Sequence, residues 1–250
     1  WYSIAYILGI IIGWLYAGKI IKETAKNKYN FEPVKKSDFD DLLIYLVIGI
    51  ILGGRLGYVM FYNFDYYSQN LVEIFKIWQG GMSFHGGLLG VIVAIYIFSI
   101  NKNANFFKLS DIVACASPIG LFLGRIANFI NGELFGKIST LPWAVIFPNG
   151  GNIARHPSQI YEAILEGVVL FILINFLALK KHLIIKTGYV SSFFLISYSI
   201  LRIFSENFRE PDQHLGYLFN YFSMGTLLSI LTLIAGFLII FFIKKNEQNN

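Results

Sequence analysis

Seven long apolar runs follow one another along this chain and leave little length for anything else. They fall at about 2–21, 41–62, 85–100, 111–131, 159–179, 187–205 and 222–243. A helix needs about 20 apolar residues to cross the hydrocarbon core of a bilayer. Barrel strands instead alternate apolar and polar residues over about ten positions, and these runs are continuous. The sequence therefore predicts an all-α polytopic membrane protein, with seven transmembrane helices in a single domain, 1–250.

Composition excludes the common soluble classes. Only 14% of the residues are charged, against about 25% in soluble domains. The single cysteine, Cys115, has no partner within the chain, which excludes a disulfide scaffold. A net charge of +5 would suggest nucleic acid for a soluble protein, but here no nucleic-acid partner is expected. The chain opens with Trp1 and no charged segment, so we expect no cleavable signal peptide and expect native residues upstream.

Lysines mark one face of the predicted bundle. Thirteen of the fifteen lysines follow the first, third, fifth or seventh apolar run. The positive-inside rule makes that face cytoplasmic, which places the N-terminus outside and the C-terminus in the cytoplasm. The outward segments are then 63–84, 132–158 and 206–221. These segments are rich in Gly, Trp, Tyr, Asn and Pro.

The five arginines do not follow the lysines, because all lie in outward halves of runs or in outward segments. Arg55, Arg125 and Arg202 each lie roughly 21 to 22 Å above the inner end of their run, at 1.5 Å per residue. Guanidinium groups bind phosphate oxygens in pairs, so this layer suggests a phospholipid headgroup as ligand. The structural alternative is that each arginine pairs with a carboxylate or extends to the surface.

The densest polar run is 124–136. Arg125 and Asn128 are three residues apart and share a helix face. Asn131 and Gly132 are expected to end that helix, leaving Glu133 on the following loop. The alternative to a headgroup site is interhelical hydrogen bonding, which accounts for an asparagine better than for an arginine.

A glycine-rich run, 78–87, precedes the third apolar run. His85 falls at the N-terminal end of the predicted helix, where the helix dipole favours neutral imidazole, able to accept a proton. A hydrogen-bonded structural histidine is the alternative.

Two further runs, 155–162 and 202–212, lie at the ends of the fifth and sixth apolar runs. Pro157 and Ser158 mark a helix start, Arg202 and Glu206 are four apart and can pair, and Arg209 lies near the interface. Tyr58 fits an aromatic belt at the outer interface. The sequence contains no metal-ligand spacing, phosphate loop or dinucleotide fingerprint, so no metal or cofactor is expected.

Five of these motifs together closely resemble the prolipoprotein diacylglyceryl transferase family. They occur in the same order as in that family and cover almost the whole chain. They are 54–58, 80–87, 124–136, 155–159 and 208–212. The resemblance implies a seven-span enzyme of the bacterial plasma (inner) membrane. Its expected reaction moves the diacylglyceryl group of phosphatidylglycerol to the lipobox cysteine thiol in the signal peptide of a prolipoprotein, forming a thioether and releasing glycerol 1-phosphate.

The resemblance also assigns residues. The family's functional positions correspond to Tyr2, His85, Arg125, Asn128, Glu133, Gly136, Arg202 and Glu206. We expect His85, Arg125, Arg202 and Glu206 to serve catalysis, with the active site towards the outer leaflet. Headgroup binding is expected from Tyr2, Arg55, Tyr58, Asn128, Asn131, Glu133, Gly136 and Arg209. Two rivals stay open: an anionic-lipid transporter and a membrane protein that binds lipid without turning it over.

Overall fold

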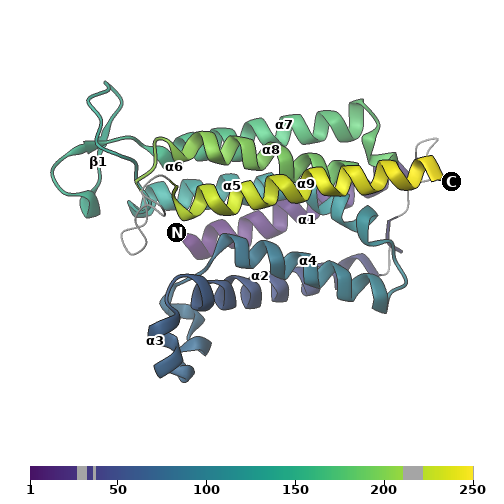
Figure 1. Ribbon diagram of the computed structural model, residues 1–250, viewed down its shortest axis with the longest axis horizontal. Coiled ribbons are helices and arrows are strands. Elements are labelled where there is room, and N and C mark those ends of the chain that lie inside the picture. Colours follow the sequence, from purple (N-terminus) through teal and green to yellow (C-terminus); the bar gives the residue numbers. More distant parts are fainter. Residues whose placement is uncertain (27–32, 36–37, 211–221, 250) are drawn as a thin grey trace. The chain divides into compact units, whose positions relative to one another are not determined.

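The computed structural model describes residues 1–26, 33–35, 38–210 and 222–249 (Figure 1). The chain divides into two compact units. The first unit contains Trp1–Phe31 and Asp111–Asn250, and the second contains Glu32–Ser110. Helix α5 crosses the boundary between them.

Within the described residues, the first unit is built on five long helical segments. They are α1 (Tyr2–Lys26), α5 (Phe106–Asn131), a continuous segment over Ser158–Lys180, α8 (Tyr189–Glu206) and α9 (Met224–Asn249). The third of these combines α6 (Ser158–Glu162), the π-helical η5 (Ala163–Val169), α7 (Leu170–Asn175) and the π-helical η6 (Phe176–Lys180). A short 3₁₀ turn, η7 (Leu183–Ile185), leads into α8.

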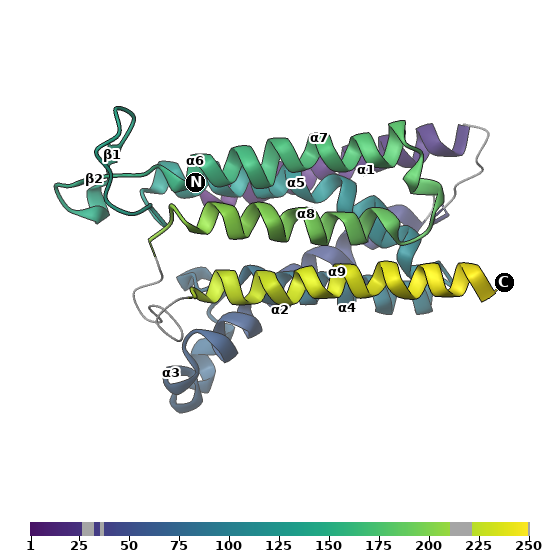
Figure 2. The ribbon, with the colours of Figure 1, turned by 45° about the horizontal axis from the view of Figure 1, so that its top comes forward.

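Helix α8 lies between α7 and α9 in both ribbon views (Figure 2). Its start is fixed from another helix, because Asp111 of α5 accepts hydrogen bonds from Gly188 N and Ser191 N at 2.7 Å each. Carboxylates stabilise helix N-termini in this way, by satisfying backbone N–H groups that lack a partner within the helix.

A small ribbon projects beyond the helices of the first unit. Strand β1 (Val145–Ile146) pairs antiparallel with β2 (Ala154–Arg155), and the 3₁₀ turn η4 (Pro148–Gly150) lies between them. Trp143 is anchored to the helices because its Nε1 donates to Tyr161 Oη at 2.7 Å.

The second unit is a pair of closely packed helices, α2 (Phe39–Phe61) and α4 (Phe84–Asn101). Glycines make the close approach possible: a methyl group at Gly53 would lie 2.7 Å from Gly90 Cα, and one at Gly57 would lie 2.6 Å from Gly86 Cα. Small residues at helix interfaces let backbones pack directly against each other in this way. One end of the pair carries α3 (Phe64–Gln69) and two 3₁₀ turns, η2 (Leu71–Phe75) and η3 (Ile77–Gln79).

Six of the seven predicted runs form helices long and apolar enough to cross a membrane, within the part of the chain that the structure describes. They are Tyr2–Thr24, Phe39–Phe61, Phe84–Asn101, Phe106–Asn131, Ser158–Lys180 and Met224–Gln248. The sixth run forms α8, which is not among these because it carries five serines together with Arg202 and Glu206. A predominantly helical membrane protein is thus supported, while seven spans and the orientation of the termini stay predictions.

Candidate active site

Two buried carboxylates form the centre of the site in the first unit. Glu162 ends α6 and Glu166 lies in η5, and both side chains are 0% exposed. Residues four apart lie on the same side of a helix. A carboxylate inside a membrane span is stable only when charged or polar partners surround it. The residues that pair with these two glutamates therefore define the site.

Three arginines converge on the pair. Arg125 of α5 places Nε 2.9 Å from Glu162 Oε2 and Nη2 3.0 Å from Glu166 Oε2. Arg202 of α8 places Nη1 3.0 Å from Glu162 Oε1 and 3.2 Å from Glu166 Oε1. Arg209, which follows α8, places Nη1 3.2 Å from Glu162 Oε1. Glu162 thus contacts all three guanidinium groups.

Glu206 completes the cluster. Its Oε2 lies 2.6 Å from Arg202 Nη2, which confirms the predicted pairing of these two residues. Its Oε1 accepts a hydrogen bond from Ser223 Oγ at 2.8 Å. A methyl group on Gly225 would lie about 3 Å from the Glu206 carboxylate, so the start of α9 packs directly against it.

Among the residues that the structure describes, three arginines face three glutamates, so the charges of these six side chains balance. Buried ions are tolerated when paired and hydrogen-bonded, and removal of one partner leaves an uncompensated charge. Among the described residues, none accepts a hydrogen bond from Arg125 Nη1. That group can therefore bind an added phosphate oxygen without breaking an existing pair.

A second chain of hydrogen bonds runs beside the cluster. Asn128 Nδ2 donates to Tyr2 Oη at 2.5 Å, and Tyr2 Oη donates to Glu133 Oε2 at 2.6 Å. Gln159 Nε2 donates to the carbonyl oxygen of Glu133 at 2.7 Å, which fixes the loop that carries this carboxylate. The structure thus brings Tyr2 together with Asn128 and Glu133, which lie 126 and 131 residues away in the sequence. Asn131 ends α5, as predicted, and Gly132 follows it with φ +67°.

Gly136 lies where two other segments meet. It pairs with Arg209 in an antiparallel bridge, and its N–H donates to His156 O at 2.9 Å. A methyl group at this position would lie 2.5 Å from Phe208 O and 2.6 Å from His156 Cβ. Only glycine fits this close approach, which brings the loop after α5 against the end of α8.

Arg55 belongs to the second unit, and its side chain is fully engaged there. Nε donates to Ile74 O at 2.8 Å, and Nη2 donates to Glu73 O at 2.6 Å and to Lys76 O at 3.3 Å. Nη1 donates to Gly80 O at 2.5 Å and to Gly81 O at 3.3 Å. The headgroup role predicted for Arg55 stays a prediction, and it would require some of these bonds to break.

Tyr58 and His85 also lie in the second unit. The Tyr58 ring stacks on Tyr62, with centroids 5.7 Å apart. His85 is the second residue of α4, as predicted for the start of this helix, and its ring contacts Phe84 edge-on at 5.3 Å. Ser83 caps the helix because its Oγ accepts a hydrogen bond from Gly86 N at 3.2 Å.

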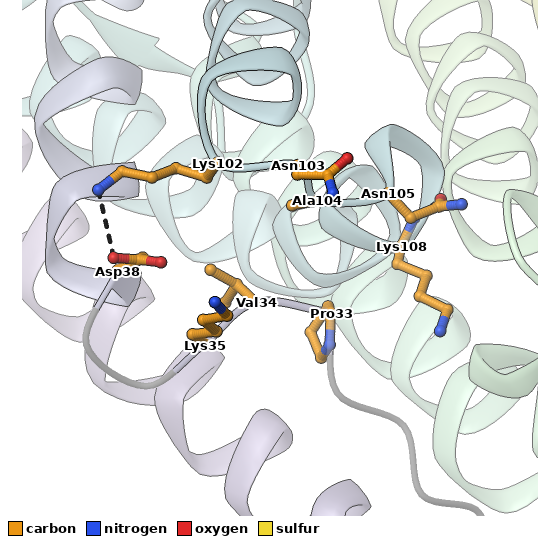
Figure 3. A pocket seen from close by; sticks show the side chains of 9 residues that line it. All are labelled: Pro33, Val34, Lys35, Asp38, Lys102, Asn103, Ala104, Asn105 and Lys108. Carbon is orange, nitrogen blue, oxygen red and sulfur yellow. Dashed lines mark hydrogen bonds and ion pairs between the residues drawn. The ribbon is translucent and has the colours of Figure 1, made fainter.

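A cavity of about 250 Å³ in the second unit contains none of the predicted site residues (Figure 3). Its lining includes Lys102, whose Nζ lies 2.7 Å from Asp41 Oδ2 and 3.2 Å from Asp38 Oδ1. These hydrogen bonds, that to Asp41 first, raise the pKa of Lys102 above its ordinary value. Both carboxylates thus pair with the Lys102 ammonium group. The cavity lies where the loops at the start of α2 and at the end of α4 meet.

Sequence reasoning missed the two central carboxylates. Glu162 belongs to the run 155–162 but has no predicted role, and Glu166 has none either. Their positions four apart inside the apolar run 159–179 are a usable signal, because carboxylates there require cationic partners. The structural alternative for the arginines, pairing with carboxylates, holds for Arg125 and Arg202, while Arg55 pairs with backbone carbonyls instead.

Comparison with known proteins gives one consistent result. The family model described as prolipoprotein diacylglyceryl transferase matches residues 1–242. A protein of Allorhizobium ampelinum named phosphatidylglycerol–prolipoprotein diacylglyceryl transferase is 48% identical over 94% of this chain and 83% of its own length. A protein with the same name from Rickettsia felis is 48% identical over 94% of this chain and 89% of its own length. One from Rickettsia bellii is 47% identical over 99% of this chain and 90% of its own length.

Proposed function

Because the chain belongs to the prolipoprotein diacylglyceryl transferase family, we propose that it transfers the diacylglyceryl group of phosphatidylglycerol to the lipobox cysteine thiol of a prolipoprotein. The sulfur forms a C–S bond to the terminal glycerol carbon, and the C–O bond to phosphate breaks. Glycerol 1-phosphate leaves, and the thiol proton passes to a base. The protein is thus a bacterial transferase whose two substrates are a membrane lipid and a secreted precursor.

The convergence of Arg125 and Arg202 on one buried carboxylate pair carries this proposal. The pair fixes both guanidinium groups before a substrate arrives. Negative charge develops on the phosphate as the C–O bond breaks, so cations held in place stabilise the transition state more than the bound lipid. Arg125 Nη1 is the group that we assign to a phosphate oxygen. Glu206 acts as a positioning residue, since its carboxylate holds Arg202.

Tyr2, Asn128 and Glu133 are proposed to bind the phosphatidylglycerol headgroup. Their amide, hydroxyl and carboxylate groups already form one hydrogen-bonded chain, which can exchange partners with the hydroxyls of the glycerol headgroup. Gly136 holds the loop that carries Glu133. The headgroup-binding roles predicted for Asn131, Arg209 and Tyr58 stay predictions.

His85 is the proposed general base. A thiol has an ordinary pKa of about 8.5, so at neutral pH it reacts faster beside a group that can take its proton. A neutral imidazole at the start of a helix is suited to that task. The acceptor cysteine belongs to the substrate, and Cys115 is a buried core residue with no role in this reaction.

We place the protein in the bacterial inner membrane, with seven spans that include α8 and with the site near the outer leaflet. The lysine distribution supports an external N-terminus and a cytoplasmic C-terminus. Helix α8 can cross the membrane although it is less apolar than the others, because its polar side chains Ser192, Ser199, Arg202 and Ser205 are buried against the rest of the first unit.

The direct test uses purified protein, phosphatidylglycerol and a synthetic lipobox peptide. We expect the peptide to gain the mass of one diacylglyceryl group, and a peptide with serine in place of the cysteine to gain nothing. A transporter or a lipid-binding protein would leave both peptides unmodified. That result would refute the proposal.

A further inference from the structure

Arg55 holds an irregular loop entirely through main-chain carbonyls. A guanidinium group has five N–H bonds, and the five hydrogen bonds of Arg55 go to carbonyl oxygens between Glu73 and Gly81. The side chain is buried and also lies over the Tyr67 ring, 5.0 Å from its centroid. The segment 73–81 is built from 3₁₀ turns and connecting residues, so few of its carbonyls are satisfied within the segment itself.

The same loop leads directly into α4. Gly80 and Gly81, which both accept from Arg55 Nη1, have φ values of +86° and +77°. Two residues later, Ser83 N donates to Gly54 O at 2.8 Å, and Ser83 then caps α4. Consecutive residues of α2, Gly54 and Arg55, thus fix the path by which the chain enters α4.

His85 lies between the residues fixed by these contacts. Ser83, two residues before it, is bound to α2, and Gly86, directly after it, packs against Gly57 of α2. The backbone of His85 therefore has little freedom while the loop is held. A displacement of the loop at Gly80 and Gly81 would alter the first turn of α4, which carries the His85 side chain.

We propose that Arg55 is a positioning residue for His85: it orders the loop 73–81 and so fixes the start of α4. This inference rests on the proposed function, in which His85 takes the thiol proton. The headgroup role predicted from the sequence is the rival account. The two roles of Arg55 predict different kinetics. If Arg55 binds the headgroup, its substitution changes KM for phosphatidylglycerol; if it positions His85, its substitution changes kcat.

A double-mutant cycle separates these accounts. Arg55→Lys keeps the positive charge but cannot reach five carbonyls, and we expect kcat to fall by about tenfold or more, as small displacements at reacting groups do. KM for phosphatidylglycerol should stay within about twofold. In a His85→Asn background the same substitution should change kcat by less than about twofold, because residues that act together are not additive.

Lys76→Gln is the matched control. It removes a positive charge from the same loop but leaves the Lys76 carbonyl in place, and its side chain pairs only with Glu73 among the described residues. We expect kcat and KM of this variant to equal those of the wild type. Gly81→Ala is a second variant that should disturb the same loop, for use if Arg55→Lys folds poorly. Its added methyl group would lie 2.6 Å from the Tyr58 ring, at a position whose φ is already positive.

Hydrogen exchange tests the structural half of the inference without any assay of activity. Amides of 83–87 should exchange faster in Arg55→Lys and in Gly81→Ala than in the wild type, and should not change in Lys76→Gln. An unchanged exchange rate in Arg55→Lys would overturn the inference, as would equal losses of kcat in both backgrounds or a raised KM alone. An inactive wild type would instead refute the proposed function, and the exchange result would still decide whether Arg55 orders α4.

Discussion

Glu162 has the most demanding environment of any single residue in the site, because its fully buried carboxylate contacts three guanidinium groups. Glu162→Gln keeps the size of the side chain and removes the charge. Among the described members of the cluster, three arginines would then face two glutamates in a buried region. Loss of one partner from a buried ion pair costs about 3 to 5 kcal/mol, so we expect a large drop in thermal stability in detergent micelles.

Glu210→Gln is the control for this measurement. Glu210 also pairs with an arginine, Arg155, at 3.2 Å, but its side chain is 42% exposed. Exposed ion pairs contribute about 0 to 1 kcal/mol, so this variant should unfold close to the wild-type temperature. Equal shifts for the two variants would contradict the buried ion pairs of Glu162 described above.

Arg125→Lys tests the geometry of the other side of the cluster. Arg125 uses Nε for Glu162 and Nη2 for Glu166, which leaves Nη1 for phosphate. Lysine keeps the positive charge, but its single nitrogen cannot replace all three of these groups. Turnover of phosphatidylglycerol should fall by at least about tenfold, equivalent to 1.4 kcal/mol. Full activity of the lysine variant would show that charge alone is sufficient at this position.

At the scale of elements, the contact between α2 and α4 depends on glycines facing glycines. Gly53→Ala would place a methyl group 2.7 Å from Gly90 Cα, where backbone must move. Overpacking of this kind costs about 1 to 3 kcal/mol. Gly120→Ala, in helix α5, meets nothing within 4 Å among the described residues and should be neutral or stabilising. Thermal unfolding of both variants checks this, and a stable Gly53→Ala would contradict the packing.

The sequence predicts helices better than it predicts the segments between them. Helix starts at Phe84 and Ser158 and the end of α5 at Asn131 lie within a residue or two of the predicted positions, because apolar length, proline and glycine act locally. The path of the segment 73–81 could not be predicted, since the Arg55 side chain contacts it from 18 to 26 residues away. The polar residues of α8 are visible in the sequence, but their burial against neighbouring helices is not.

The same limit applies to the site. The motif over 124–136 and the pair Arg202 and Glu206 are visible in the sequence because their members lie within a few residues of each other. The contact from Tyr2 to Glu133 spans 131 residues, and the arginines meet Glu162 and Glu166 across 36 to 47 residues. Charge in an apolar run signals that a partner exists, but only the fold identifies that partner.

For the whole molecule, the predicted orientation is testable by labelling. Cys115 is buried and gives a low background, so single cysteines can be placed at Asn149 and at Lys245, which are both exposed. In intact spheroplasts a membrane-impermeant thiol reagent should label the first and not the second. The reverse pattern would place the arginine cluster near the inner leaflet, where a secreted acceptor could not reach it.

The central claim is an alkyl transfer in which one phosphate leaves for each sulfur modified. Purified protein, phosphatidylglycerol and the lipobox peptide should give thioether peptide and glycerol 1-phosphate in a one-to-one ratio. The peptide product should resist hydroxylamine, because a thioether does not react with it and a thioester does. Glycerol 1-phosphate without modified peptide would indicate a hydrolase, and a product cleaved by hydroxylamine would indicate acyl transfer; either result would contradict the account.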